Sequence, residues 1–127
     1  MTVNQSLCFE DLPLGEEWVT RGRTVSESEL TAYIGLAGDF NPLYADRQAA
    51  GQGPNQGVLI PGALIIAVAF GLGSIDLPPS NIVALVGTTW RFLQTVRVGD
   101  TLHTRWRLNR KRPVENPIWG LAVWQIE

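Results

Sequence analysis

The spacing of apolar residues differs between the two halves of the chain. In the first half, Ser26 and Glu29 match a helix capping box, and the apolar residues that follow at helical spacing are Leu30, Tyr33, Ile34 and Ala37. Gly38 then suits a helix end in the left-handed conformation. This pattern predicts a helix that begins after Ser26 and stops at Gly38.

The most apolar segment of the chain runs from Val58 to Leu72. Pro61 suits the first turn of a helix, and residues 63–70 are apolar on all sides of that helix. The segment is short for a membrane span, because a helix needs about 20 apolar residues to cross a bilayer. We therefore expect a central helix that is buried on every side.

The second half of the chain is rich in Val, Thr, Leu and Trp, which favour strands. Three strands are predicted in succession, at residues 82–98, 101–108 and 118–126. A shorter strand is expected within Glu16–Thr24. Because short turns separate the three later strands, they should form an antiparallel meander.

Charged and apolar residues alternate along the middle strand, where Arg105 and Arg107 alternate with Trp106 and Leu108. Such alternation gives a strand one wet face and one packed face. The apolar helix that begins near Pro61 can cover the packed face. The sequence thus predicts an α+β fold in which an antiparallel sheet wraps around one long helix, as a single domain over residues 1–127.

The composition is that of a globular protein that binds neither nucleic acid nor a membrane. The chain has 45% hydrophobic residues and a net charge of -2, which does not favour polyanionic partners. Its single cysteine excludes an internal disulfide, and we expect no metal and no cofactor, because no matching motif is visible. The first residues lack the pattern of a signal peptide, so we expect a cytoplasmic location.

The stretch from Gly38 to Tyr44 places a lone carboxylate among turn-forming residues. Asp39 follows the expected helix end, and Asn41-Pro42 stiffens the backbone after it. Such a bend can direct an acidic side chain into a cavity, but a plain loop between helices has a similar composition. We interpret the glycine-rich segment 51–57 as a connector in preference to a mobile flap, because it lacks a phosphate-binding pattern.

The order of these local patterns resembles the MaoC-like branch of the hot-dog proteins, which contains the (R)-specific enoyl-CoA hydratases and related dehydratases. The residues that carry the resemblance are Phe9 to Leu12 with Gly15, Arg23 to Ser26, Gly38 to Leu43, Ile60 to Gly62, Arg91-Phe92, Val96, and Val98 to Asp100. The resemblance implies a hot-dog fold and an enzyme that adds water to, or removes it from, an acyl-CoA or acyl-carrier-protein thioester.

By similarity, several residues receive roles in this reaction. Asp39 is the general base, Asn41 orients the site, and the backbone N–H of Gly62, next to Pro61, donates to the thioester oxygen. Hydration of a conjugated thioester requires a base for water, a proton donor for the α carbon and donors for the enolate oxygen. A helix N-terminus supplies such donors with a partial positive charge.

Two positions depart from the family pattern Gly-Asp-x-Asn-Pro-hydrophobic-His. Tyr44 stands where the family has the His, and Pro61 stands where a second His often precedes the helix. Tyrosine in solution has a pKa of about 10, so its hydroxyl donates a hydrogen bond at neutral pH but is a poor base. His103, the one His in the chain, is expected on a strand surface.

Family members usually add one more strand after the one predicted at residues 118–126, whereas this sequence stops at Glu127. The sheet would then have an open edge, and proteins usually cover such edges, often with a partner subunit. We therefore expect a homodimer or a higher homo-oligomer, as is usual for hot-dog proteins.

Three functions remain open on the sequence alone. The first is a hydratase or dehydratase with an altered acid-base pair, in which Asp39 is the base and Tyr44 the donor. The second is a non-catalytic hot-dog subunit that binds an acyl-thioester or completes a partner. The third is a thioesterase, isomerase or cyclase on the same scaffold, because a fold does not determine a function.

Overall fold

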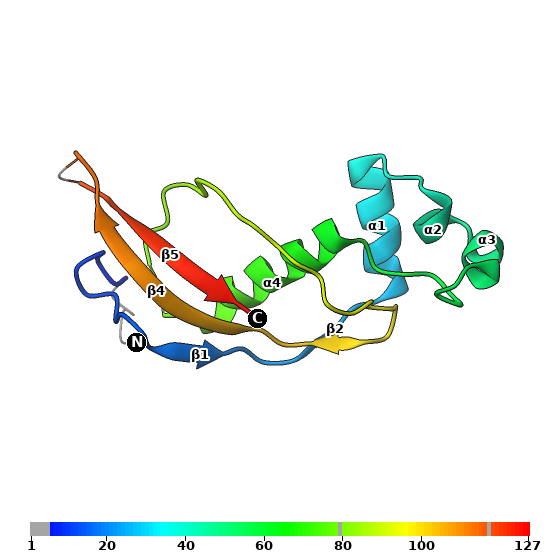
Figure 1. Cartoon of the computed structure of the whole chain (residues 1–127), viewed down its shortest axis with the longest axis horizontal. Coiled ribbons are helices and arrows are strands. Elements are labelled where there is room, and N and C mark those ends of the chain that lie inside the picture. The colour runs from blue at the N-terminus through cyan, green and yellow to red at the C-terminus, as the bar shows by residue number, and fades with distance from the viewer. Residues whose placement is uncertain (1–5, 79, 117) are drawn as a thin grey trace. The chain divides into compact units, whose positions relative to one another are not determined.

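The computed structural model describes residues 6–78, 80–116 and 118–127. The described residues form two compact units, and Figure 1 shows their helices and strands. Unit 1 contains the residues up to Arg21, Gly71–Thr89 and His103–Glu127, and unit 2 contains Gly22–Phe70 and Trp90–Leu102. The long helix α4 (Gly62–Asp76) contributes its first part to unit 2 and its last part to unit 1.

Unit 1 is built on a three-stranded antiparallel sheet in the order β1-β4-β5. The strands are β1 (Glu17–Val19), β4 (Arg105–Pro113) and β5 (Gly120–Ile126). Along β4, Arg105 and Arg107 are exposed, whereas Trp106 and Leu108 are only 6% and 0% exposed. The predicted alternation between a wet face and a packed face is therefore confirmed for this sheet.

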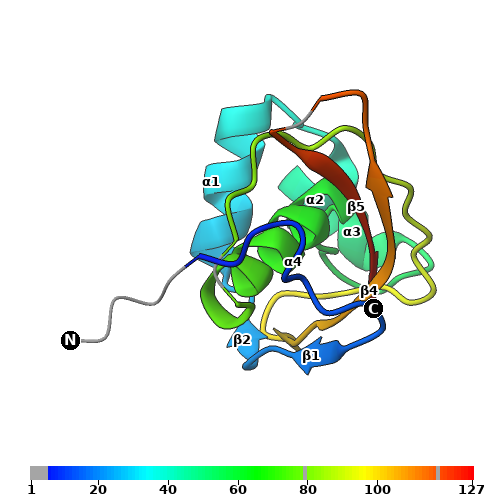
Figure 2. The same cartoon turned by 90° about the vertical axis from the view of Figure 1, so that its left-hand side faces the viewer.

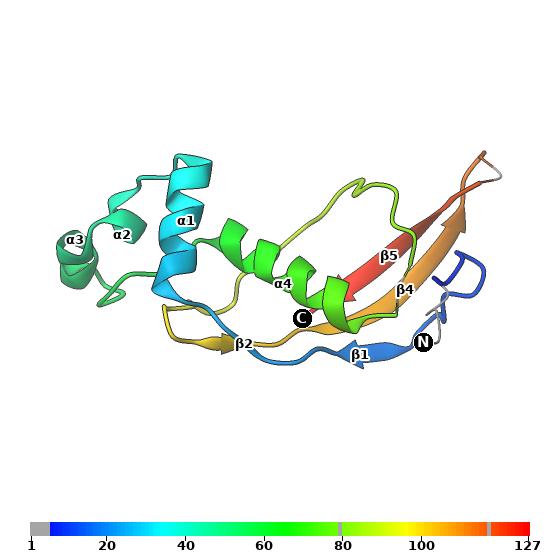
Figure 3. The same cartoon turned by 180° about the vertical axis from the view of Figure 1, so that it is seen from behind.

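The packed face of the sheet carries a cluster of three indole rings. Trp18 is the register partner of Trp106, and the Trp124 ring centroid lies 5.6 Å from that of Trp18 and 6.0 Å from that of Trp106. The last part of α4 runs beside β4 (Figures 2 and 3). Its Gly73 packs against the ring cluster, because a Cβ atom there would lie 2.5 Å from Cζ2 of Trp106. Only glycine allows the helix to approach the ring this closely.

Two buried threonines satisfy the polar groups beside this cluster. The Thr104 N–H donates to Oγ1 of Thr20 at 2.9 Å, and the Trp106 Nε1–H donates to Oγ1 of Thr104 at 2.9 Å. A buried donor left without a partner costs about 1–3 kcal/mol. The network therefore stabilises the orientation in which the Trp106 ring lies against Gly73.

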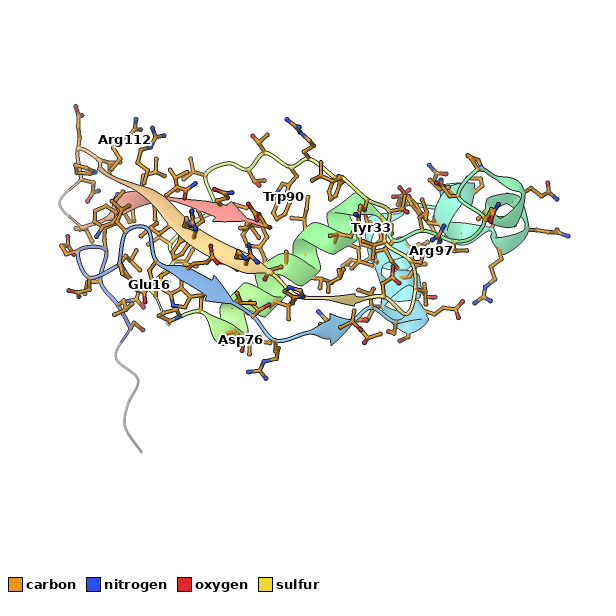
Figure 4. The ribbon with its side chains drawn as sticks, turned by 60° about the horizontal axis from the view of Figure 1, so that its bottom comes forward. Glu16, Tyr33, Asp76, Trp90, Arg97 and Arg112 are labelled. Atoms are coloured by element: carbon orange, nitrogen blue, oxygen red, sulfur yellow. The ribbon has the colours of Figure 1, made fainter. Side chains whose placement is uncertain are left out.

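An ion pair holds the C-terminal end of α4, at Asp76 (Figure 4). The Arg21 Nε–H donates to Asp76 Oδ1 at 2.8 Å, and the Arg21 backbone N–H donates to Oδ2 at 2.6 Å. These hydrogen bonds hold the pKa of Asp76 below its ordinary value of 3.8, and the one from the Arg21 side chain has the larger effect. The pKa of Asp76 is lower in the folded than in the unfolded chain, so these hydrogen bonds stabilise the folded protein fully above the ordinary pKa of 3.8. This contribution to the free energy of unfolding is lost as the pH falls through the pKa of the folded state.

Helix α1 (Glu27–Ala37) of unit 2 follows Ser26, as the sequence predicted. The capping box is formed, with the Ser26 hydroxyl accepting from the Glu29 N–H and the Glu29 carboxylate accepting from the Ser26 N–H at 2.7 Å. Gly38 ends the helix in the left-handed region, at a φ of 68°. Both ends of this helix are therefore confirmed.

Two short helices and a two-stranded sheet complete the regular structure of unit 2. Helices α2 (Pro42–Ala45) and α3 (Arg47–Gln52) follow α1 along the chain, as Figure 1 shows. Strand β2 (Arg23–Thr24) pairs antiparallel with β3 (Thr101–Leu102). The expected strands at Glu16–Thr24 and 101–108 are thus each divided in two.

The predicted strand at residues 82–98 is wrong. These residues are all described, and they contain no strand beyond one isolated bridge between Arg97 and Leu59. Most of their side chains are exposed, with Ile82 and Leu93 at 82% each. Residues of high β propensity form a strand only where a neighbouring strand pairs with their backbone, and within the described chain this segment has none.

The prediction of a central helix buried on every side is also wrong. Leu64, Val68 and Leu72 of α4 are buried, but Ala63 and Ala67 are exposed. The segment that was expected to supply a covering strand forms none, and one side of the helix stays open in the single chain. None of the helices among the described residues is long and apolar enough to cross a membrane.

Replacing Gly73 by Ala should destabilise the protein by about 1–3 kcal/mol, because an added Cβ would overlap the ordered Trp106 ring. Gly51→Ala is the matched control: Gly51 lies in α3, and its Cβ would meet nothing within 4 Å, so it should stabilise the protein by about 0.5–1 kcal/mol. Chemical denaturation measures both changes. A Gly73→Ala protein as stable as the wild type would contradict the close contact.

Candidate active site

The bend that carries Asp39 is fixed by hydrogen bonds on both sides. Before it, the Gly38 N–H donates to the Ile34 carbonyl of α1 at 2.9 Å. After it, Asn41 caps α2, its Oδ1 accepting from the Leu43 N–H at 3.0 Å. Asp39 is half-buried between these two caps. The carboxylate therefore projects from a short backbone segment that has little conformational freedom.

Asn41 and Tyr44 meet through the backbone of α2. The Tyr44 N–H donates to the Asn41 carbonyl at 2.9 Å, within the turn that Pro42 begins. The Asn41 side-chain oxygen is used by the helix cap, so Asn41 can orient the site through the position of α2 and through its amide N–H groups. This arrangement places Tyr44 one helical turn after the bend.

The Tyr44 side chain lines an apolar groove of about 380 Å³ within unit 2, which we call the α1–α2 groove. Its lining residues are Glu27, Leu30, Thr31, Ile34, Gly35, Phe40, Tyr44, Ala45, Arg47 and Val58. The five residues from α1 stand at positions i, i+3, i+4, i+7 and i+8, so they belong to one face of that helix. The groove therefore lies between this face and the chain around α2.

Asp39 and Tyr44 are not joined in a hydrogen-bonded pair. Neither the Asp39 carboxylate nor the Tyr44 hydroxyl forms a hydrogen bond with any residue that the structure describes. Asp39 and Asn41 also do not line the α1–α2 groove. The structure thus places the candidate base and the candidate donor in the same unit, with both polar groups available to a bound molecule.

The start of α4 lies in the same unit and offers free backbone donors. The Pro61 carbonyl accepts from the N–H groups of Leu64 and Ile65 at 3.0 and 3.1 Å, which closes the first turn. The N–H groups of Gly62 and Ala63 precede this turn and have no acceptor within the helix. This is the arrangement required for the oxyanion donor that the sequence resemblance assigned to Gly62.

The Phe92 ring lies against this helix start. A Cβ atom on Gly62 would be 2.8 Å from Cε2 of Phe92, so a larger residue would displace the ring. The approach to the helix is fixed by the Ile60 N–H, which donates to the Val96 carbonyl at 2.8 Å. Packing therefore requires a glycine at position 62.

Hydrogen bonds fix the segment that connects α3 to α4. The Gly57 N–H donates to the Ala50 carbonyl at 3.1 Å. Arg97, labelled in Figure 4, donates from Nη2 to the Asn55 carbonyl at 2.6 Å. These contacts support the interpretation of the glycine-rich segment as a connector.

Two ion pairs, Arg23–Glu29 and Arg47–Glu27, lie near the start of α1. The Ser26 backbone N–H is the main cause that holds the pKa of Glu29 below its ordinary value, with a smaller contribution from Arg23. Arg47 forms an ion pair with Glu27 at the edge of the α1–α2 groove. In the described parts of the chain, no three His, Cys, Asp or Glu side chains are grouped so as to hold a metal ion.

Residues 11–123 match the family model described as the MaoC like domain. The matched range covers most of the chain and contains both the Asp39 bend and the start of α4. The chain belongs to the MaoC-like dehydratase family. A curated relative, Protein MaoC of Klebsiella aerogenes, is 29% identical over 126 residues, which are 93% of this chain and 37% of that protein. The MaoC-like chain thus spans well under half the length of this relative.

Solved structures show the same fold. A monoamine oxidase regulatory protein from Archaeoglobus fulgius superimposes with a TM-score of 0.85 at 25% identity, over 95% of this chain and 82% of that one. The (R)-hydratase from A. caviae, involved in PHA biosynthesis, superimposes with a TM-score of 0.73 at 24% identity, over 92% and 86% of the two chains. The MaoC-like chain therefore has the α+β hot-dog fold that the sequence predicted.

Two features of this MaoC-like site were missed by reasoning from the sequence. One is the α1–α2 groove, for which the glycine at position 35 inside a predicted helix was the available signal. The other, in the same unit, is the environment of Trp90, whose Nε1–H is buried and has no acceptor among the described residues. Its ring packs edge-on against Phe70 with 6.2 Å between centroids, a contact that no local pattern predicts.

His103 and the arginines of β4 belong to unit 1. His103 is exposed and lies between β3 and β4, so the strand expected at residues 101–108 is interrupted at this residue. Arg107 donates to a Glu17 carboxylate oxygen at 2.9 Å, and Arg105 Nε lies 3.4 Å from the other oxygen. These arginines are accounted for by ion pairs on the wet face of the sheet.

Proposed function

We propose that this MaoC-like chain is an acyl-thioester hydratase or dehydratase. It adds water to an enoyl thioester, or removes water from a 3-hydroxyacyl thioester, carried by CoA or by an acyl carrier protein. It works in the cytoplasm without a cofactor, and residues 1–127 act as one hot-dog domain. The observation that carries the proposal is the bend at Asp39, which is held between the caps of α1 and α2 in a chain of this family. The Asp39 carboxylate forms no hydrogen bond with any described residue, so it is available to a substrate.

In the hydration direction, Asp39 removes a proton from water while the oxygen of that water bonds to C3. The electron pair of the double bond moves to the thioester oxygen and forms an enolate. Tyr44 donates a proton to C2 as the enolate collapses to the carbonyl, and the proton held by Asp39 returns to the Tyr44 oxygen through solvent. One water is added, and both side chains recover their starting states.

The N–H groups at the start of α4 stabilise the enolate oxygen in this scheme. Gly62 and Ala63 present donors that the helix does not use, and the helix dipole adds a partial positive charge. Donors of this kind typically contribute about 10²- to 10³-fold to kcat. The buried Pro61 fixes the position from which they project.

The second candidate function is a non-catalytic subunit that binds an acyl-thioester. It is favoured by one observation: Tyr44, which stands where the sequence resemblance expects a His, lines an apolar groove. A tyrosine hydroxyl is a poor base at neutral pH, so Asp39 must carry the base function alone. A thioesterase, isomerase or cyclase on this scaffold would also use the oxyanion donors, but would not require water to be added at C3.

Asp39→Asn should lower kcat/KM for the hydration of enoyl-CoA by about 10²- to 10⁴-fold, because it removes the general base while keeping the shape of the bend. Loss of the enoyl absorbance measures the reaction. Asp46→Asn is the matched control, since Asp46 is an exposed carboxylate that caps α3 and lies outside the proposed site. Tyr44→Phe should lower the rate while binding of saturated acyl-CoA persists.

Two outcomes would contradict this assignment. Wild type without hydration activity, together with a gain of activity in Tyr44→His, would favour the non-catalytic subunit. Release of free thiol from the thioester, without loss of the enoyl absorbance, would favour a thioesterase.

The chain should sediment as a homodimer, because a second copy would cover the apolar side chains of residues 82–93. Val86 is 81% exposed in this segment, so Val86→Lys should weaken the dimer, whereas Val114→Lys in the β4–β5 turn should not. Sedimentation velocity distinguishes the species. A wild-type chain that is monomeric at micromolar concentration would overturn the expectation.

A further inference from the structure

We propose that Arg97 is a positioning residue for the oxyanion donors at the start of α4. Its guanidinium holds a strained turn in the connector that leads into this helix. The inference rests on the proposed function, because it concerns the placement of Gly62 relative to Asp39. All three residues belong to unit 2. Arg97 touches no reacting atom in this scheme and acts only through the backbone that it holds.

The connector contains a backbone conformation that its sequence does not favour. Gln56 has a φ of 51°, and no other residue that the structure describes, glycine aside, has a positive φ. This left-handed conformation is unfavourable for a side chain such as glutamine, because the Cβ atom crowds the following carbonyl oxygen. Such a conformation persists only where surrounding contacts hold it. The turn at Gln56 therefore depends on the contacts on either side of it.

Arg97 contacts the chain on both sides of Gln56. Before it, Nη2 of Arg97 donates to the Asn55 carbonyl at 2.6 Å. After it, the backbone of Arg97 forms the isolated antiparallel bridge with Leu59. One residue thus closes the span 55–59, which contains the strained turn. Loss of the guanidinium would remove the hydrogen bond on the Asn55 side, so that Gln56 could relax toward a negative φ.

The backbone of Arg97 is itself fixed by the turn that follows it. The Arg97 N–H donates to Oδ2 of Asp100 at 2.8 Å, and the Asp100 N–H donates to the Arg97 carbonyl at 3.1 Å. This turn is joined to Val25, whose N–H donates to the Asp100 carbonyl at 2.9 Å and whose carbonyl accepts from the Gly99 N–H at 2.8 Å. Val25 is fully buried and directly precedes the N-cap of α1. The guanidinium therefore extends from a well-fixed backbone.

These contacts join the two helices on which the proposed site depends. Helix α1 follows Val25, and its C-cap directly precedes Asp39. The connector leads into α4 through Ile60, whose N–H donates to the Val96 carbonyl at 2.8 Å. The segment 96–100 therefore bonds to the chain just before each helix. A shift of the connector would misplace the oxyanion donors, and a misplacement of about 1 Å can cost about 10²-fold in rate.

Arg97→Met tests the proposal, because methionine keeps much of the length of the side chain but cannot donate. The kcat for hydration of crotonyl-CoA should fall by about tenfold while KM changes by less than about twofold, as expected when a transition-state contact is misplaced. Arg97→Lys should retain most of kcat, because an ammonium group also donates to a carbonyl. Arg110→Met is the matched control, since Arg110 is exposed on β4 and its side chain bonds to no described residue. It should leave kcat unchanged.

Gln56→Gly separates positioning from a general loss of stability. Glycine adopts a positive φ without strain, so the turn should need Arg97 less. Added to Arg97→Met, Gln56→Gly should restore kcat by about threefold or more, whereas Gln52→Gly, at an exposed helical position of α3, should not. An Arg97→Met protein with the kcat of the wild type, or one that Gln56→Gly does not restore, would overturn the proposal.

Amide hydrogen exchange tests the same hold on the helix without turnover. In Arg97→Met, the Ile60 N–H should exchange about tenfold faster or more, because its bond to Val96 opens with the connector. The Gly38 N–H, which donates to the Ile34 carbonyl, should keep its rate. This result in a protein that hydrates nothing would count against the proposed function alone. An unchanged Ile60 rate, or an equal rise at both amides, would overturn the positioning role.

Discussion

Helix α4 can pack as it does only because it presents glycine where aromatic rings lie against it. In unit 1 the Trp106 ring occupies the space that a Cβ on Gly73 would need, and in unit 2 the Phe92 ring does the same at Gly62. Each contact brings the helix backbone close to a ring whose position is fixed by a hydrogen bond. The Trp106 ring is held by its own bond to Thr104. The segment that carries Phe92 is held by the bond from the Ile60 N–H to the Val96 carbonyl. The sheet packing and the exposed helix start both depend on this close approach.

The site combines that helix start with a bend whose geometry is local. Gly38 reverses the chain after α1, and Asn41 starts α2, so Asp39 is held between two caps that need no distant contact. Tyr44, which stands where the sequence resemblance expects a His, leaves this bend intact. What differs is the side chain that follows the bend. The Tyr44 hydroxyl can donate a hydrogen bond at neutral pH, whereas the imidazole of a His could also accept a proton. The proposed mechanism therefore keeps Asp39 as the base and the N–H groups at the start of α4 as oxyanion donors, and it changes the proton donor.

Sequence patterns predicted the features that depend on neighbours in the chain. The capping box at Ser26 and the alternation along β4 follow from spacing alone, and both are confirmed. The strand expected at residues 82–98 failed because a strand also needs a partner backbone, which composition does not supply. The α1–α2 groove was not predicted for a similar reason: it exists only because Tyr44 and Val58 are brought to the face of α1 that contains Gly35.

The most direct test of this account is a crystal structure of the Asp39→Asn protein with a 3-hydroxyacyl-CoA bound. The account predicts that the C3 hydroxyl lies within hydrogen-bonding distance of the side chain at position 39. It also predicts that the thioester oxygen accepts from the Gly62 N–H. A thioester bound with its oxygen away from the start of α4, or with C3 out of reach of position 39, would contradict it.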